Sequence, residues 1–482
     1  MAGDGDRALR PTFRYISPRE KSMNFPPGKP ILFLLIAAIL SGLGILLLGR
    51  GVPQQADLRV WVFDESHAAS YRNPGPNGAS LTRLYQQRTG QSVEVKLIPS
   101  RALDARLISL FHAGRNGREL PDVVEVEIAS VGKYFRGSPG SVPFLPLDRY
   151  LRQSGLDIRL VANRLAPYTK DGVIFGIPAD VHPVTITYRR DLFDQAGVDL
   201  ASAQTWEQFH DRCLDFESYW RNAGEAKRRA MELSRTGASD LMMLLLQRGV
   251  NLVDEAGQVH LADRRVASTL AFYAQMVAGR RAIAEGAAAG SLLWVRDLAD
   301  GRLCAALTPD WRIRYLREMA PELSGKLAMM PLPRFEPTDA PTSTWGGTML
   351  GIPRNVANPD AAWALLDFLL ASPEGLAARR EHTDILPPLR DVMASLTLND
   401  PDPFFGGQRV AALYAELARQ VPANRMHAYT PLVSQALADV LGQAIARVEA
   451  GQTQDLDQAC QEMLAQSQRE LESLIRFGEA RP

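Results

Sequence analysis

The sequence predicts an α/β protein with a parallel β-sheet, and two observations support this fold class. Between residues 57 and 128, short runs rich in β-branched residues alternate with longer stretches of helical pattern. This β-α-β-α-β order is typical of parallel strands joined by crossover helices. The 482 residues are 46% apolar and 22% charged, as in globular proteins. These proportions exclude an intrinsically disordered or collagen-like chain.

The strands and helices of this first region follow in order. Residues 57–63 alternate between polar and apolar side chains, which is typical of a strand. We then expect a helix, a strand, a helix and a strand at residues 81–88, 92–98, 103–112 and 122–128. Ligands bind at the carboxyl ends of the strands in such sheets. The residues just after these strand ends, Asp64, Glu65 and Glu127, are therefore candidates for a site.

Capping signals mark three later helices. Thr205 and Gln208 have the spacing of a capping box, Asn358 precedes a proline, and Thr453 follows a glycine break. In the first helix, large apolar residues recur at steps of three and four, which predicts that they are buried. We also assign the large apolar residues of the second helix to the core, and those of the third keep one face of that helix apolar. In chain order, the residues of the three helices are Trp206, Phe209, Cys213, Phe216 and Trp220; Trp363, Leu366, Phe368 and Leu369; and Leu456, Cys460, Met463, Leu471 and Leu474.

An uncharged apolar run lies near the N-terminus, at residues 31–48. As a helix it would be roughly 27 Å long, close to the thickness of the hydrocarbon core of a bilayer. Basic residues outnumber acidic ones before the run, so the positive-inside rule predicts a cytoplasmic tail at 1–30. We therefore predict a transmembrane signal anchor at 31–49 in the cell (inner) membrane, with residues 51–482 on the periplasmic or extracellular side. A cleaved signal peptide is the alternative.

The composition and the missing motifs exclude several classes of function. Lys plus Arg and Asp plus Glu both number 54, so there is no excess of cations of the kind that binds nucleic acid. The nucleophile-elbow, zinc-protease, phosphate-loop and dinucleotide-binding motifs are absent from the sequence. The three cysteines include no Cys-x-x-Cys pair, and no two of the seven histidines are four residues apart. We expect neither enzymatic activity nor a cofactor or metal.

Several predicted loops place an aromatic side chain close to a carboxylate or to glycines. The residues concerned are Trp61, Asp64, Asp310, Trp311, Trp345, Gly346 and Gly347. Sugars present apolar C–H faces, which stack on indole rings, and hydroxyl groups, which donate to carboxylates. Glycine lets the backbone approach a ligand closely. The pattern favours a carbohydrate-binding site.

A longer series of motifs extends over residues 57–482. In chain order they are Val60-Trp61-Val62-Phe63, Leu120-Pro121-Asp122-Val123-Val124, Pro146-Leu147-Asp148, Phe175-Gly176-Ile177-Pro178, Tyr188-Arg189-Arg190-Asp191-Leu192-Phe193, Thr205-Trp206, Asp300-Gly301-Arg302, Asp310-Trp311 and Thr344-Trp345-Gly346-Gly347. Their order resembles that in the family 1 extracellular solute-binding proteins, the carbohydrate receptors of ABC importers that include maltose-binding protein.

The resemblance implies a periplasmic-binding-protein fold of type II-like topology, in which two α/β lobes are joined by crossing strands and close by hinge bending. It implies a first lobe at 57–176 and 333–384 and a second lobe at 177–326 and 385–482. The ligand contacts that it implies are Trp61, Asp64, Glu127, Asp180, His182, Asp310, Trp311, Trp345, Gly346 and Gly347.

The resemblance also implies a function without catalysis. We expect a membrane-anchored, extracytoplasmic substrate-binding protein that captures a sugar or oligosaccharide and delivers it to the permease subunits of an ABC transporter. Two alternatives stay open. One is an anchored solute sensor that signals to a membrane partner. The other is a carbohydrate-active hydrolase whose two carboxylates would be Asp64 and Asp180.

Overall fold

A computed structural model describes residues 28–47, 56–114, 119–286, 292–394 and 400–479. The chain divides into two units, Met1–Gln55 and Ala56–Pro482. Helix α1 (Lys29–Leu47) belongs to the first unit. Most of the predicted cytoplasmic tail, residues 1–27, and the last two residues of the predicted anchor lie outside the described residues.

The described helices were compared with the length and hydropathy that a membrane span requires. No single helix among them is long and apolar enough to cross a membrane. One bent pair, Pro359–Ala371 with Pro373–His382, meets the requirement jointly, by length and composition only. The transmembrane anchor at 31–49 therefore finds no support in the described part of the chain.

Within the second unit, five strands form a first sheet in the order β2-β1-β3-β12-β6. β1, β2 and β3 are parallel, as predicted. β12 follows the strands of the second sheet along the chain and lies antiparallel between β3 and β6. The order of strands and helices in residues 57–128 could not predict this strand. The strands are β1 (Leu58–Val62), β2 (Val93–Leu97), β3 (Val123–Glu127), β6 (Ile177–Pro178) and β12 (Thr348–Gly351).

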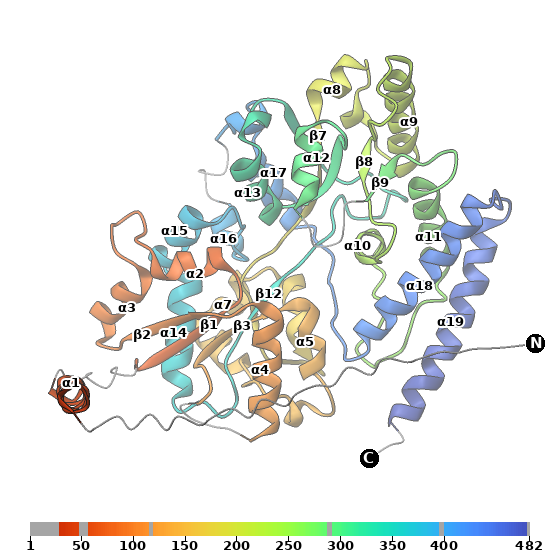
Figure 1. Cartoon of the computed structure of the whole chain (residues 1–482). Coiled ribbons are helices and arrows are strands. Elements are labelled where there is room, and N and C mark those ends of the chain that lie inside the picture. The colour runs from red at the N-terminus through yellow and green to blue at the C-terminus, as the bar shows by residue number, and fades with distance from the viewer. Residues whose placement is uncertain (1–27, 48–55, 115–118, 287–291, 395–399, 480–482) are drawn as a thin grey trace, which may run out of the picture. The chain divides into compact units, whose positions relative to one another are not determined.

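Helices from two separate stretches of this unit, residues 65–159 and 359–393, cover the first sheet. The predicted helices at 81–88 and 103–112 are confirmed as α3 and α4, whereas α2 was not predicted. In Figure 1, α14 lies among elements that precede it by more than two hundred residues, and its apolar side chains share one core with β1 and β3. The helices are α2 (Glu65–Arg72), α3 (Leu81–Thr89), α4 (Ser100–His112), α5 (Ile128–Tyr134), α6 (Asp148–Ser154), α7 (Leu156–Arg159), α14 (Pro359–Ala371), α15 (Pro373–His382) and α16 (Arg390–Met393).

A second five-stranded sheet has the order β11-β7-β10-β8-β9. Its strands are β7 (Val184–Arg189), β8 (Met231–Glu232), β9 (Ala284–Glu285), β10 (Ala305–Pro309) and β11 (Leu327–Met330). Its helices are α8 (Arg190–Gln195), α9 (Trp206–Asn222), α10 (Ser239–Gln247), α11 (Arg264–Val277), α12 (Leu293–Ala299), α13 (Asp310–Met319), α17 (Val410–Ala418), α18 (Thr430–Glu449) and α19 (Leu456–Glu479). A separate hairpin joins β4 (Thr169–Lys170) to β5 (Val173–Ile174).

The chain passes between the two sheets three times, and we call these connections the crossing segments. The first, residues 179–183, joins β6 to β7, and the second, residues 331–347, joins β11 to β12. The third, of which residues 383–394 and 400–409 are described, leads from α15 to α17. These connections, with one sheet on either side, give the two-lobed α/β architecture. We call the part built on the first sheet the first lobe and the part built on the second sheet the second lobe.

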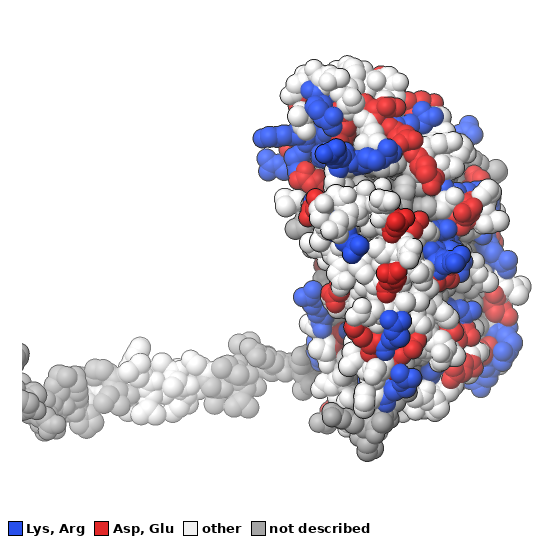
Figure 2. Space-filling model, turned by 90° about the vertical axis from the view of Figure 1, so that its right-hand side faces the viewer, with Lys and Arg blue, Asp and Glu red and all other residues white. Residues whose placement is uncertain are grey.

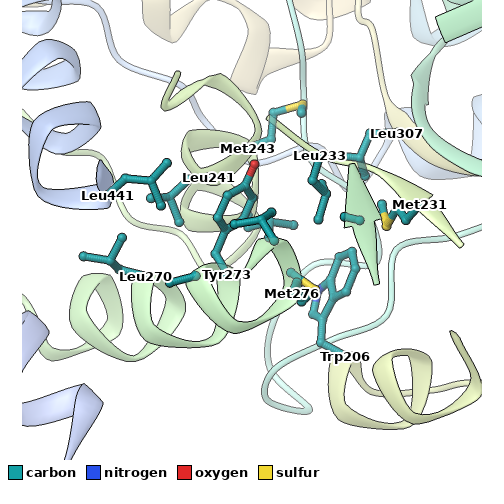
Figure 3. Close-up of a cluster of buried hydrophobic side chains, with 14 of the residues drawn as sticks. Trp206, Met231, Leu233, Leu241, Met243, Leu270, Tyr273, Met276, Leu307 and Leu441 are labelled. Carbon is teal, nitrogen blue, oxygen red and sulfur yellow. The ribbon is translucent and has the colours of Figure 1, made fainter. Parts of the chain in front are cut away.

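The predicted core helices are largely confirmed. Thr205 and Gln208 form the capping box of α9, and Asn358 caps α14. The apolar side chains predicted to be buried in these two helices are all buried. In Figure 3 the Trp206 indole lies close to the side chains of α10, α11 and β8 that make up the core of the second lobe.

One prediction for the last helix was wrong. α19 begins at Leu456, so Thr453 lies before the helix and does not cap it. Leu471 is 7% exposed, but Leu474 is 67% exposed. The apolar spacing continues to the end of the helix, and the partly buried Ile475 still packs against the core of the second lobe, but Leu474 lies on the exposed side.

On the face of the molecule in Figure 2, basic and acidic side chains are interspersed over the surface of the folded unit. They do not gather there into one patch of a single sign, in keeping with the equal numbers of both charges in the sequence.

Candidate ligand-binding site

A cavity of about 590 Å³ lies where the two lobes meet the crossing segments. On the side of the first lobe, residues after the carboxyl ends of β1 and β3 line it, as expected for parallel strands. The crossing segments and α13 line the rest. We call it the front cavity; its lining includes Phe63, Asp64, His67, Glu127, His182, Trp311, Arg314, Tyr315, Glu318, Trp345, Gly346, Gly347, Asp384 and Ile385.

Asp64 reaches the front cavity because it is the N-cap of α2. Its Oδ1 accepts hydrogen bonds from the backbone N of Ser66 (2.8 Å) and of His67 (3.3 Å), and from Ser66 Oγ (2.5 Å). Burial opposes ionisation, but the positive charge of His67 and these hydrogen bonds outweigh it and lower the pKa of Asp64. The side chain is therefore a fixed carboxylate at the cavity wall.

Two indole rings form an aromatic wall of the same cavity. Trp311, in the first turn of α13, and Trp345, in the second crossing segment, meet edge to face with ring centroids 5.8 Å apart. Trp311 Nε1 donates to the backbone oxygen of Trp345 (3.0 Å), which holds the Trp311 ring against the second crossing segment. Tyr315, one turn along α13, packs against Trp311 with centroids 6.2 Å apart. Trp311 and Trp345 are both partly exposed, so their rings are available to a ligand.

Gly346 and Gly347 bring backbone to the cavity wall. Both have positive φ angles, +87° and +155°, which L-residues rarely adopt. A Cβ at Gly347 would lie 2.5 Å from the Arg164 guanidinium and 3.0 Å from the Tyr168 hydroxyl. The close approach of Arg164 therefore requires glycine here.

A second cavity of about 600 Å³ adjoins the front cavity, and we call it the side cavity. Glu127, Trp345 and Gly346 line both. Beyond them the side cavity is lined by α10, by the loop that follows it and by the segment that leads into α18. Its polar lining consists mainly of amides and hydroxyls: Thr236, Ser239, Asn251, Thr344, Asn424, Thr430, Ser434 and Gln435, together with Arg425.

Three of the predicted site residues do not line the front cavity. Trp61 is 3% exposed, lies under the Arg106 guanidinium at 4.5 Å, and borders a different cavity. Successive side chains of a strand point to opposite faces, and Trp61 packs with α4 while its neighbours Val60 and Val62 join the other core. Asp180 and Asp310 are 0% and 1% exposed.

The carboxylate pair considered for a hydrolase is not assembled in the cavity. Asp180 is fully buried and pairs with Arg164 (3.0 Å) and His182 (3.1 Å), whereas Asp64 lies at the cavity wall. The two side chains therefore do not face a common substrate position.

Two residues at or behind the cavity, His67 and Arg164, were not predicted from the sequence. His67 lines it, and its Nδ1 lies 3.0 Å from the fully buried Glu125, which also accepts from the Tyr71 hydroxyl. Burial opposes protonation of His67, but the charge of Glu125 outweighs it and raises the pKa of His67. The sequence signal that could have predicted His67 is the N-cap of a helix directly after β1, because His67 lies in the first turn of that helix. Arg164 carries no local signal, because its partners are far away in the sequence.

The chain was compared with known protein families and structures. The model of the bacterial extracellular solute-binding proteins matches residues 81–402. An arabinooligosaccharide-binding protein of Halalkalibacterium halodurans is 24% identical over 339 residues, which are 68% of this chain and 72% of that protein. A lactose-binding protein of Rhizobium radiobacter is 25% identical over 64% of this chain and 71% of its own.

Solved structures share the fold. The sugar-binding protein MalE of Xanthomonas citri has a TM-score of 0.67 at 19% identity, covering 86% of this chain and 99% of its own. A binding protein of B. animalis subsp. lactis in complex with β-1,6-galactobiose has a TM-score of 0.63 at 18% identity, covering 88% of this chain and 97% of its own. With its two lobes, three crossing segments and interlobe cavity, this chain belongs to the bacterial extracellular solute-binding proteins.

Proposed function

We propose that this protein captures a sugar or oligosaccharide in the front cavity and delivers it to the permease of an ABC transporter. The observation that carries the proposal is that the aromatic wall of Trp311 and Trp345 and the fixed carboxylate of Asp64 line the same cavity. An indole face suits the C–H face of a sugar, and a carboxylate suits its hydroxyls. The protein performs no chemical step in this role.

Each residue of the cavity has a part in the proposed binding mode. Trp345 and Trp311 stack on the sugar, while Asp64 and Glu127 accept hydrogen bonds from its hydroxyls. Gly346 and Gly347 let the second crossing segment lie close to the ligand. A longer oligosaccharide continues past Glu127 and Trp345 into the side cavity, whose amides and hydroxyls suit neutral sugar units.

The known relatives support the class of ligand. The two similar curated proteins bind arabinooligosaccharides and lactose, and one similar structure contains β-1,6-galactobiose. We extend this class to the present chain. The lobes that close on the ligand are, in this proposal, the predicted ones with two changes at their bounds: β6 (Ile177–Pro178) belongs to the first lobe, and β11 (Leu327–Met330) belongs to the second.

The location of the protein belongs to the same proposal. We infer that residues 31–49 hold the protein at the cell membrane, with the tail 1–30 inside and residues 51–482 outside. Protease treatment of intact spheroplasts tests this: the lobes should be digested while an epitope at the N-terminus stays protected. Digestion of both, or release of the lobes without their N-terminal segment, would contradict the anchor.

Thermal unfolding of the full chain in detergent tests the function. Ligands that bind only the folded state raise the Tm, so we expect a mono- or oligosaccharide to raise it at millimolar concentration. Trp345→Ala should weaken binding of that sugar at least about tenfold, since stacking area is lost. Tyr219→Ala, which removes an exposed aromatic ring on α9, is the matched control. If no carbohydrate changes the Tm of the wild type, the proposed function is wrong.

A further inference from the structure

Four charged side chains form a buried chain behind the front cavity. Arg164, Asp180, His182 and Asp310 are between 0% and 4% exposed. Arg164 comes from the first lobe, Asp180 and His182 from the first crossing segment, and Asp310 from the start of α13 in the second lobe. We call these four residues the hinge lock.

Arg164 joins the first crossing segment to the second. Its Nη2 donates to Asp180 Oδ1 (3.0 Å) and to the backbone oxygen of Gly346 (3.3 Å). Its Nη1 donates to Thr344 Oγ1 (3.0 Å), and that hydroxyl donates in turn to the backbone oxygen of Val181 (3.0 Å). One guanidinium therefore fixes both segments and the glycines of the cavity wall.

His182 lies between two carboxylates. Its Nδ1 is 2.6 Å from Asp310 Oδ1, and its Nε2 is 3.1 Å from Asp180 Oδ2. The contact with Asp310 is a hydrogen bond, whereas the contact with Asp180 Oδ2 is an ion pair without hydrogen-bond geometry. A neutral imidazole protonated at Nδ1 would turn its Nε2 lone pair toward Asp180, whereas the imidazolium is attracted by both carboxylates. The backbone of His182 has a φ of +55°, a strained conformation that its contacts maintain.

Asp310 joins the third crossing segment to the same chain. Its Oδ2 accepts a hydrogen bond from the backbone N of Leu386 (2.7 Å). Its Oδ1 faces His182 and also accepts a hydrogen bond from the backbone N of Trp311 (2.9 Å). The carboxylate thus connects the first crossing segment, the third crossing segment and the helix that carries the aromatic wall.

The four charges balance only when His182 is protonated. One guanidinium and one imidazolium then compensate two carboxylates, whereas a neutral His182 leaves an uncompensated negative charge in a buried site. Burial alone would lower the pKa of His182, but Asp180 and Asp310 outweigh it and raise the pKa to about 9. The other charged groups that line the front cavity with His182 are Asp64, Glu65, His67, Glu127, Arg314, Glu318 and Asp384.

We propose that Asp180, His182 and Asp310 are positioning residues that set the angle between the lobes, and that they control ligand affinity through this angle instead of contacting the ligand. All three crossing segments converge on them, and a hinge motion must change the geometry of these segments. This role goes beyond the proposed function and does not depend on which solute binds.

The proposal predicts how the hinge responds to pH. The folded-state pKa of His182 is raised above its ordinary value of 6.5, so its stabilising contribution is complete below that pH and is lost as the pH rises through about 9. The unliganded protein should therefore keep one distribution of interlobe distances from pH 6 to 8 and change to a broader one near pH 10.

The experiment measures the distance between spin labels on the two lobes of the unliganded full chain by double electron–electron resonance. The labels are attached through Gln87→Cys on α3 and Glu207→Cys on α9, both exposed positions, while the native cysteines are buried. Asp310→Asn and His182→Gln should broaden the distribution already at pH 7. Asp310→Asn should also move the transition to lower pH, since one of the two carboxylates that hold the proton on His182 has lost its charge.

Glu125→Gln is the matched control, because it disrupts a buried histidine–carboxylate pair that lies within one lobe. It should leave both the label distances and the pH of the transition unchanged. Unchanged distances in Asp310→Asn and His182→Gln, or no transition in the wild type while circular dichroism shows it folded at pH 10, would overturn the proposal. The wild-type titration keeps the test decisive if a variant fails to fold.

A second measurement separates this proposal from the proposed function. With the sugar that gives the largest rise in Tm, calorimetry should give an affinity about tenfold weaker in Asp310→Asn, the effect of one lost charge-assisted contact. If no sugar binds the wild type but the label distances respond as described, the proposed function fails and the hinge lock stands. If sugars bind but the label distances do not respond, the proposed role of the hinge lock fails and the proposed function stands.

Discussion

The chain contains two buried histidine–carboxylate clusters at the front cavity, and they differ in what they connect. His67 and Glu125 lie in the first lobe, on α2 and β3, with 3.0 Å between Nδ1 and Oε2. His182 lies between Asp180 and Asp310 and connects the first crossing segment to the second lobe. The chemistry of the two clusters is the same, and in each the carboxylate raises the pKa of the histidine.

The difference shows that burial and charge alone do not assign a role to an ion pair. A pair within one lobe stabilises that lobe, because both partners move together when the lobes rotate. A pair across crossing segments stabilises one arrangement of the lobes relative to another. The same substitution in the two clusters should therefore have different consequences, which the following variants examine.

The largest effect is expected from Asp180→Ala. It leaves the guanidinium of Arg164 and the imidazolium of His182 without their common partner in a fully buried site. Uncompensated buried charge typically costs about 3–5 kcal/mol of the free energy of unfolding, which urea denaturation would measure. Asp180→Asn, which keeps the shape and one acceptor, should cost clearly less. An equal loss in both variants would mean that packing, not charge, is what matters at this position.

An intermediate effect is expected from Glu125→Gln. The amide keeps the volume but removes the charge that faces His67, at a cost of about 1.5–3 kcal/mol in the free energy of unfolding near pH 6. Because the pKa of His67 is raised in the folded state, this contribution is present below pH 6.5 and disappears as the pH rises through the raised value. The stabilities of variant and wild type, measured by urea denaturation from pH 5 to 9, should therefore converge at alkaline pH. A constant difference would contradict the assignment of the effect to His67.

The smallest effect on stability is expected from Asp64→Asn. Asparagine caps a helix about as well as aspartate, so the free energy of unfolding should change by less than about 0.5 kcal/mol. Sugar affinity, measured by calorimetry, should nevertheless fall, because a charged acceptor at the cavity wall becomes a neutral one. Asp64→Ala is the companion variant, and it should lose the cap as well, at about 1 kcal/mol. Full affinity in Asp64→Asn would remove Asp64 from the proposed ligand contacts.

Elements held by local chemistry were predictable from the sequence. The capping box of Thr205 and Gln208 and the N-cap of Asn358 lie within four residues of the groups that they bind, so the sequence contains the whole interaction. The three parallel strands of the first sheet were predictable for a similar reason, because each connection is a short helical crossover. Leu474 shows the limit of this reasoning: its spacing fits the apolar face of α19, but no packing partner reaches it.

The candidate site was predictable in kind and only partly in composition. Asp64, Trp311, Trp345 and the two glycines line one cavity, as loops after strand ends suggest. Trp61 lies on the face of β1 that packs with α4, and it does not reach the front cavity. Successive side chains of a strand point to opposite faces, and the sequence does not say which of the two faces is open to a ligand.

The sequence by itself determined the family, the α/β class and the residue types that line the front cavity, because these depend on local patterns and on motif order. Only the tertiary structure decided that Asp180 and Asp310 hold His182 behind the cavity. Arg164, Asp180, Asp310 and Leu386 come from four distant parts of the chain, and their contacts span from 16 to 182 residues. No local spacing encodes such contacts, since they exist only when the three crossing segments are brought together.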